Sequence, residues 1–382
     1  MRKFLYILIP SLFLCLLVGV GYWAGGYVVA QKFERLIQWV EKGETLAGVL
    51  SITKLTEEQR SHYRNAYSNP SFDERNVSWS VPNQLTPFVG NAPVPGQHQN
   101  AYINSLQMRN QQELQTPKPK DTYRIFLTGG STAFGSGAPS QERTIGALLG
   151  ELLNASPAAK DSLRYEVFTL ANPAWASTHE RIAIENYLSE LQPDLVISLS
   201  GNNDVFWGDA GRNVLWFNAF ADDYHKSLIN TALNVTGRKG PPELQSTLSL
   251  AKPVPPETVA RRIEKNIRLG SLALQENNVK WVFFLQPTLS VAKKPLTKRE
   301  NDFVPASKNY YIECYKAIAS KLSSVGSDNF EFVDLSAAFD KFSEQEDMFL
   351  DQFHFGDKGN VVIAGAIFSA LSNQVKATAP RP

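Results

Sequence analysis

The feature that most constrains the fold is a nearly continuous apolar segment, Asp194–Ser200, with the sequence DLVISLS. A strand with one face in water alternates apolar and polar residues, whereas a strand covered on both faces is apolar along most of its length. This segment therefore predicts a central strand of a sheet that carries helices on both faces.

Other apolar segments and segments of helical spacing alternate on either side of this strand. Strands are predicted at Tyr123–Leu127, Tyr165–Leu170, Trp281–Leu285 and Phe330–Val333, and helices at Arg143–Leu153, Thr178–Leu191, Thr258–Gln275, Ala306–Ser323 and Lys358–Leu371. Such alternation indicates βαβ units, and therefore an α/β fold with a parallel sheet between helices. Right-handed crossovers place the carboxyl ends of the strands along one edge, where ligands bind in such sheets.

The N-terminus predicts a membrane anchor. Arg2 and Lys3 precede an apolar run from Phe4 to about Ala30, and about 20 apolar residues suffice to cross the hydrocarbon core. The positive flank favours a cytoplasmic N-terminus, so we expect the remaining chain to lie outside, in the periplasm or the extracellular space. The alternative is a cleaved signal peptide and a secreted protein, but the apolar run is longer than a usual signal peptide contains.

Three regions follow from these patterns. They are an N-terminal transmembrane anchor (1–31), a juxtamembrane helix with an irregular arm (32–120), and an α/β catalytic domain (121–382) with a long insert at about 205–256. Phe33, Leu36, Ile37 and Val40 have the spacing of one helix face, whereas prolines forbid long helices in the arm.

Composition excludes some classes of function. The net charge is +1 and no dense run of Lys and Arg is present, so we expect no nucleic-acid partner. The two cysteines, Cys15 and Cys314, lie in the anchor and in a predicted helix, and we expect no disulfide between them. The sequence has no metal-ligand spacing, and we expect no metal and no cofactor.

Two strand ends carry residues that can serve catalysis. Gly129-Gly130-Ser131 follows the first predicted strand, and Gly201-Asn202-Asn203-Asp204 follows the central one. A serine at a tight turn before a helix can be a nucleophile, and a strand-end asparagine can donate to an oxyanion. Each motif also has a structural interpretation, as a helix cap or as a turn.

The third motif is Asp351-Gln352-Phe353-His354, just before the last predicted helix. A serine hydroxyl needs a base to take its proton, and histidine serves this role near neutral pH. A carboxylate three residues earlier can reach the imidazole and fix its tautomer. The alternative is a solvated histidine beside an aspartate that caps the helix.

Together the three motifs resemble those of the SGNH (GDSL-like) hydrolase superfamily, over about residues 120–372. The resemblance implies a flavodoxin-like SGNH hydrolase fold, with Ser131 as nucleophile, His354 as general base and Asp351 as its orienting carboxylate. It also implies an oxyanion hole formed by the Ser131 N–H, a second backbone N–H and the Asn203 side chain. Ser177 stands where the family usually has the glycine that supplies this second N–H.

The function expected from this resemblance is hydrolysis of carboxylic esters through an acyl-enzyme, on an acyl or acetyl ester of a glycan or lipid. Two other functions are compatible with the same motifs: O-acyl transfer (such as O-acetyl transfer) to a cell-surface polysaccharide, and glycan binding without catalysis. A phosphate-binding turn at Gly129–Thr132 is disfavoured because no lysine lies beside it.

Overall fold

The computed structural model describes residues 2–41, 66–69, 81–156, 163–212, 233 and 252–378. Its central sheet is parallel, with the strand order β6-β5-β7-β8-β9. The strands are β5 (Thr122–Gly129), β6 (Arg164–Ala171), β7 (Leu195–Ser200), β8 (Lys280–Leu285) and β9 (Phe330–Asp334). This is the flavodoxin-like order, and it confirms the predicted parallel α/β fold.

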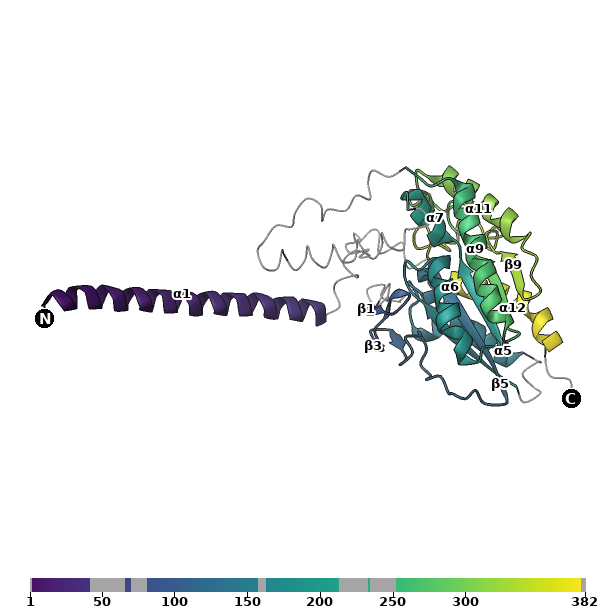
Figure 1. Cartoon of the computed structure of the whole chain (residues 1–382). Coiled ribbons are helices and arrows are strands. Elements are labelled where there is room, and N and C mark those ends of the chain that lie inside the picture. Colours follow the sequence, from purple (N-terminus) through teal and green to yellow (C-terminus); the bar gives the residue numbers. More distant parts are fainter. Residues whose placement is uncertain are drawn as a thin grey trace.

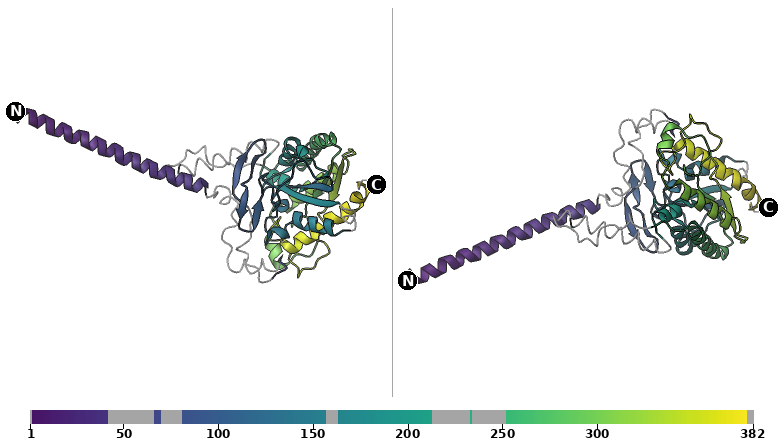
Figure 2. Two further views of the ribbon diagram at one scale, coloured as in Figure 1. Left: turned by 90° about the horizontal axis from the view of Figure 1, so that it is seen from below. Right: turned by 90° about the horizontal axis from the view of Figure 1, so that it is seen from above.

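Helices cover both faces of the sheet (Figures 1 and 2). They are α4 (Ser131–Phe134), η3 (Gln141–Arg143), α5 (Ile145–Ala155), α6 (Ser177–Asn186), η5 (Leu188–Leu191), α7 (Asn202–Asp209), α9 (Pro256–Gln275), α10 (Lys298–Asp302), α11 (Lys308–Leu322) and α12 (Asp357–Thr378). Helices α5 and α12 pack together on one face, and α6, α9 and α11 pack together on the other. The predicted helix at Thr178–Leu191 is two elements, α6 and η5, separated by Tyr187.

Successive side chains of the strands enter two different cores. Val196 of β7 packs with the helices α6, α9 and α11, whereas Ile197 packs with α5 and α12. Both side chains are buried, as are Trp281 and Val282, which pair with them on β8. Burial of both faces is the physical reason why the central strand is apolar throughout.

Strand order places a topological switch point between β5 and β7. The chain runs outward in opposite directions from these two neighbours, and ligands bind beyond the carboxyl ends of strands at such a switch point. Ser131 follows β5 and Asn203 follows β7, so two of the predicted site residues lie on either side of this switch point.

The predicted irregular arm contains two antiparallel hairpins. They pair β1 (Asn83–Thr86) with β2 (Gly90–Pro93), and β3 (Gly96–His98) with β4 (Ala101–Ile103). The first hairpin docks on the loop after β6, because Trp175 Nε1 donates to Asn91 O at 3.0 Å. Its turn places Phe88 at φ +67°, a conformation that a phenylalanine rarely adopts, so sequence pattern alone did not predict it.

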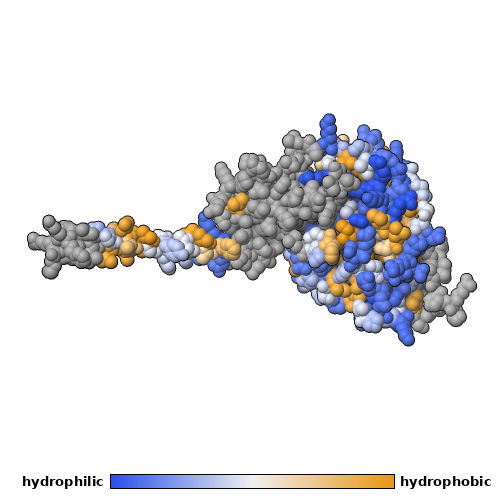
Figure 3. Space-filling model, in the orientation of Figure 1, coloured by the Kyte–Doolittle hydropathy of each residue, from blue (hydrophilic) through white to orange (hydrophobic). Residues whose placement is uncertain are grey.

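The anchor and the predicted juxtamembrane helix form one helix, α1 (Arg2–Glu41), which stands apart from the domain in Figure 1. Ile9–Arg35 is long and apolar enough to cross a membrane. Most exposed large apolar side chains of the described residues belong to this helix. Figure 3 shows apolar residues along it. At 1.5 Å per residue α1 is about 60 Å long, so it extends beyond a hydrocarbon core of about 30 Å.

Some sequence predictions lie outside the described residues. These are the arm at 42–65 and 70–80, and most of the insert, at 213–232 and 234–251.

Candidate active site

Ser131 begins α4 directly after β5, and two glycines make this turn possible. Gly129 has φ +148°, and a Cβ there would overlap the carbonyl oxygen of Leu199 on the neighbouring strand. A Cβ on Gly130 would overlap Nδ2 of Asn203. The glycines therefore allow a tight turn at the strand end and let the Asn203 amide approach the backbone next to Ser131.

A hydrogen-bonded chain connects Ser131, His354 and Asp351. The distance from Ser131 Oγ to His354 Nε2 is 2.7 Å, and the distance from His354 Nδ1 to Asp351 Oδ2 is also 2.7 Å. An ionised carboxylate only accepts, so Nδ1 carries the hydrogen and Nε2 is left to accept from the serine hydroxyl. This is the tautomer that a general base for Ser131 requires.

The Asp351 carboxylate is oriented by its own loop. Its Oδ1 accepts from the backbone N–H groups of Phe353 (2.8 Å) and His354 (2.9 Å), so Oδ2 faces the imidazole. Burial acts to raise the pKa of Asp351, but the His354 charge and these hydrogen bonds outweigh it and lower the pKa. Asp351 is therefore held as the anion.

The site lies at the surface. The side chains of His354 and Asp351 are 14% and 20% exposed, respectively. This degree of exposure leaves the Ser131–His354 pair open to a substrate that arrives from solvent.

Asn203 is the second residue of α7 and lies against the turn that carries Ser131. Its Nδ2 donates to Trp175 O at 2.6 Å, which fixes the orientation of the amide. A primary amide has two N–H donors, so this bond uses only one of them. The position beside Gly130 places the Asn203 amide where it can donate to an oxyanion on a carbonyl attacked by Ser131.

Ser177, predicted as the second oxyanion donor, has other partners. Its N–H donates to Asp204 Oδ2 at 2.9 Å, and its hydroxyl donates to Asp204 Oδ1 at 2.6 Å. Asn266 on α9 in turn donates to the Ser177 hydroxyl at 2.8 Å. The Ser177 N–H is therefore already bonded, and we leave it out of the oxyanion hole proposed below.

The Asp204 carboxylate is fully buried beneath this loop. Burial raises its pKa, against the hydrogen bonds from Ser177 and the charge of Arg262, which act to lower it. Sequence analysis singled out Asp204 only as part of a motif. Its link to Ser177 joins residues far apart in the chain, so sequence spacing could not reveal it.

Aromatic rings form one side of the site. Phe353 contacts the His354 ring edge-on, stacks on Tyr311 and meets Phe206 edge-on, with centroids 6.0–6.3 Å apart. Phe206 is 42% exposed. Phe353 entered the sequence prediction only as part of the Asp351–His354 motif, and Tyr311 did not enter it, because only the fold brings these rings together.

The other histidines in the part of the chain that the structure describes do not reach the triad. His179 is buried in α6, where its Nδ1 accepts from Ala176 N–H and burial lowers its pKa to about 3. His98 bonds to Val94 O at 2.8 Å. His62, His225, Trp216, Phe217 and Phe220 lie outside the described residues.

The chain was compared with known proteins. No protein-family model and no curated protein sequence matches it. Among solved structures, a protein from Parabacteroides merdae assigned as a GDSL-like lipase aligns with 16% identity and a TM-score of 0.41, over 65% of this chain and 95% of that one. The acetyl xylan esterase AlAXEase aligns with 16% identity and a TM-score of 0.37, over 65% and 99%. A lipase/acylhydrolase from Enterococcus faecalis aligns with 13% identity and a TM-score of 0.39, over 66% and 96%.

These identities and TM-scores are too low to transfer chemistry from those proteins to this one. The proposal below therefore rests on the geometry of this chain.

Proposed function

We propose that this protein is a serine hydrolase that cleaves carboxylic esters through an acyl-enzyme. The observation that carries the proposal is the continuous hydrogen-bonded chain from Ser131 Oγ through the His354 ring to Asp351, with 2.7 Å at each step. Neither bond alone would support it, because isolated His–Asp and Ser–His contacts also occur in structural roles. The complete chain, at the switch point between β5 and β7, matches the requirements of nucleophilic catalysis.

The proposed reaction uses these groups in sequence. Ser131 Oγ attacks the ester carbonyl while His354 Nε2 takes its proton, and Asp351 stabilises the imidazolium that forms. The Ser131 N–H and the Asn203 amide donate to the oxyanion. His354 then gives the proton to the leaving alcohol, and water, activated by the same imidazole, releases the acid and frees Ser131.

The proposed substrate is an acyl or acetyl ester on a glycan or lipid. The half-exposed Phe206 and its neighbour Phe353 support this, because an aromatic face beside a reactive serine can stack on a sugar or cover an acyl chain. The acyl-enzyme could also be released by a sugar hydroxyl, which would make the protein an O-acyltransferase. The chemistry up to the acyl-enzyme is the same in both cases.

We propose that α1 anchors the protein in a membrane with the catalytic domain on the outer side, in the periplasm or the extracellular space. The apolar stretch Ile9–Arg35 supports the anchor. Arg2 and Lys3 before it support a cytoplasmic N-terminus.

The test of the proposed function is turnover of p-nitrophenyl esters, from acetate to octanoate, by the full chain in detergent micelles. We expect hydrolysis that is lost in Ser131→Ala, with the preferred chain length reporting the size of the acyl site. Adding a sugar alcohol as acceptor separates transfer from hydrolysis, since transfer yields an acylated sugar. Equal turnover by wild type and Ser131→Ala would refute the proposal.

A further inference from the structure

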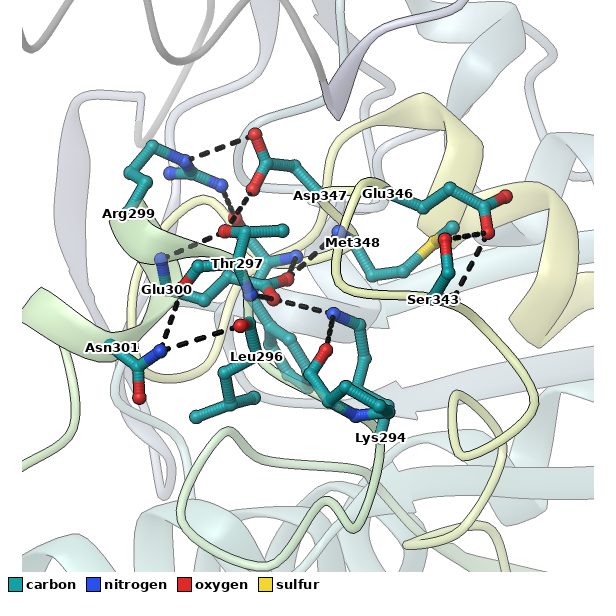
Figure 4. A network of polar contacts seen from close by, with 12 residues as sticks. Lys294, Leu296, Thr297, Arg299, Glu300, Asn301, Ser343, Glu346, Asp347 and Met348 are labelled. Carbon is teal, nitrogen blue, oxygen red and sulfur yellow. Dashed lines mark hydrogen bonds and ion pairs between the residues drawn. The ribbon is translucent and has the colours of Figure 1, made fainter.

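A second polar cluster lies next to the triad without belonging to it. It joins the segment Lys294–Glu300, which contains the start of α10, to the segment Asp347–Leu350, which directly precedes Asp351 (Figure 4). Its charged side chains are buried. The side chains of Lys294 and Glu300 are fully buried, and the side chains of Arg299 and Asp347 are 7% and 5% exposed, respectively. Buried charges carry a desolvation cost, so their contacts are informative.

Glu300 binds backbone groups on the segment that leads to the triad. Its Oε1 accepts from Met348 N–H at 3.0 Å and from Phe349 N–H at 3.2 Å. Its Oε2 pairs with Lys294 Nζ at 2.5 Å and accepts from Thr297 N–H at 3.1 Å. One carboxylate therefore ties the helix start to this segment.

Arg299 binds the next backbone groups along the same segment. Its guanidinium donates to the carbonyl oxygens of Phe349 and Leu350, the latter at 3.0 Å. It also pairs with Asp347, whose other carboxylate oxygen accepts from the Thr297 hydroxyl at 2.5 Å. The contact to Leu350 is one residue from the catalytic carboxylate at Asp351.

The far end of the triad loop closes back on the same segment. Leu350 N–H donates to His354 O at 2.8 Å, and Phe349 and Phe355 form an antiparallel bridge. The loop that presents Asp351 and His354 thus starts and ends on the backbone that Arg299 and Glu300 bind.

We propose that Arg299 and Glu300 are positioning residues, which set the Asp351–His354 pair in line with Ser131 through the backbone of Phe349 and Leu350. The expected loss of kcat rests on the proposed function, whereas the expected effect on the position of the Asp351–His354 pair does not. The competing explanation is that apolar packing of Phe339, Phe349 and Phe355, whose ring centroids are 5.0–5.4 Å apart, positions the loop without help.

Arg299→Lys tests the proposal because lysine keeps the charge but lacks the planar fork that reaches two carbonyls. The chain offers a matched control in Arg124, also buried, which donates to Leu191 O and Gln115 O and pairs with Glu166 at 3.3 Å. Arg124 lies near the start of β5, about 17 Å along the strand from Gly129. Arg124→Lys therefore makes the same chemical change far from the triad.

Each variant is measured in the full chain in detergent for p-nitrophenyl acetate turnover, thermal unfolding and the imidazole ¹⁵N shifts of His354. We expect Arg299→Lys to lower kcat by about 10- to 100-fold with little change in KM, since small misplacements of reacting groups cost about that much. The ¹⁵N shift of His354 Nδ1 should change as well, because Nδ1 is the atom that bonds to Asp351 Oδ2. Arg124→Lys should lower the unfolding temperature and leave kcat and this shift unchanged.

A second variant covers the case in which Arg299→Lys does not fold. Lys294→Met combined with Glu300→Gln removes the buried charge pair while an amide oxygen remains to accept from Met348 and Phe349. We expect it to fold and to keep kcat near wild type, whereas Lys294→Met with Glu300→Ala, which removes the acceptor, should lower kcat.

The proposal is overturned if Arg299→Lys and Arg124→Lys change kcat and the His354 Nδ1 shift to the same extent, or if both glutamate variants have equal kcat. The ¹⁵N shifts keep this test separate from the proposed function. If wild type shows no turnover, a changed Nδ1 shift of His354 in Arg299→Lys but not in Arg124→Lys still supports positioning, and unchanged shifts in both refute it.

Discussion

Two loops at the same sheet edge carry similar polar residues but use them differently. In the triad loop, Asp351 and His354 are 20% and 14% exposed, and their hydrogen bonds lead toward the Ser131 hydroxyl. The loop after β6 ends at Ser177, which is buried and bonds to the buried Asp204 of α7. Burial and the direction of the hydrogen bonds therefore distinguish the carboxylate that we propose as catalytic from the other one, whereas residue type does not.

The largest effect should come from the nucleophile. Ser131→Ala should lower ester turnover by about 10⁴- to 10⁶-fold, because the acyl-enzyme cannot form. The unfolding temperature should hardly change, since the lost atom lies at the surface of the site. Ser177→Ala is the matched control, and its effects should be the reverse. Its kcat should stay near wild type, and its stability should fall by about 1–3 kcal/mol, because the buried Asp204 Oδ1 loses the donor hydroxyl.

The orienting carboxylate should have the next largest effect. Asp351→Asn should lower kcat by about 10⁴-fold, because an amide can donate to Nδ1 and favour the wrong imidazole tautomer. The distinction between the two carboxylates would be contradicted if Asp204→Asn lowered kcat as much as Asp351→Asn at equal unfolding temperature.

A smaller effect is expected at the oxyanion donor. Asn203→Ala should lower kcat by about 10²- to 10³-fold, the usual cost of losing one such donor. Asn266→Ala removes a buried asparagine of α9 that donates to Ser177, and it serves as the control, expected to lower stability with little change in kcat. Similar kcat values for the two alanine variants would place Asn203 among the structural residues.

The smallest effect, and the one that sharpens the comparison most, is the pH dependence of stability. The lowered pKa of Asp351 means that its anion stabilises the fold above the ordinary carboxylate pKa of about 3.9, a contribution lost as pH falls through the lower native pKa. The raised pKa of Asp204 gives the opposite pH dependence of stability. The protonated Asp204 carboxyl contributes its full stability below the ordinary carboxylate pKa, and this contribution is lost as pH rises through the higher native pKa.

Denaturant unfolding of wild type, Asp351→Asn and Asp204→Asn between pH 3 and pH 7 measures both signs. As pH falls, wild type should lose stability relative to Asp351→Asn and gain stability relative to Asp204→Asn. Curves that shift in the same direction for both variants would contradict the assignment of the two carboxylates to different environments.

The sheet and the triad could be predicted from sequence because their signals are local. A strand buried on both faces is apolar along its length, as Asp194–Ser200 is, and each triad residue lies within a short motif at a strand or helix end. Once the parallel sheet is predicted, its geometry brings those motifs to one edge.

The contacts that sequence reasoning missed are formed between distant segments. Asp204 meets Ser177 only after β7 and α6 pack, and Glu300 meets Phe349 only after α10 reaches the triad loop. Thr297 and Glu300 do form a capping box, which marks the start of α10 in the sequence. Nothing in that pattern indicates that the glutamate is buried against the backbone before Asp351.

The most direct test of the central claim is the site and stoichiometry of covalent labelling by a fluorophosphonate, read by intact mass and peptide mapping of the full chain. We predict one adduct per chain, located on Ser131, with labelling slowed strongly in His354→Gln and unaffected in Ser177→Ala. A folded protein that takes no label, or that takes it on a residue other than Ser131, would contradict the assignment of Ser131 as an activated nucleophile.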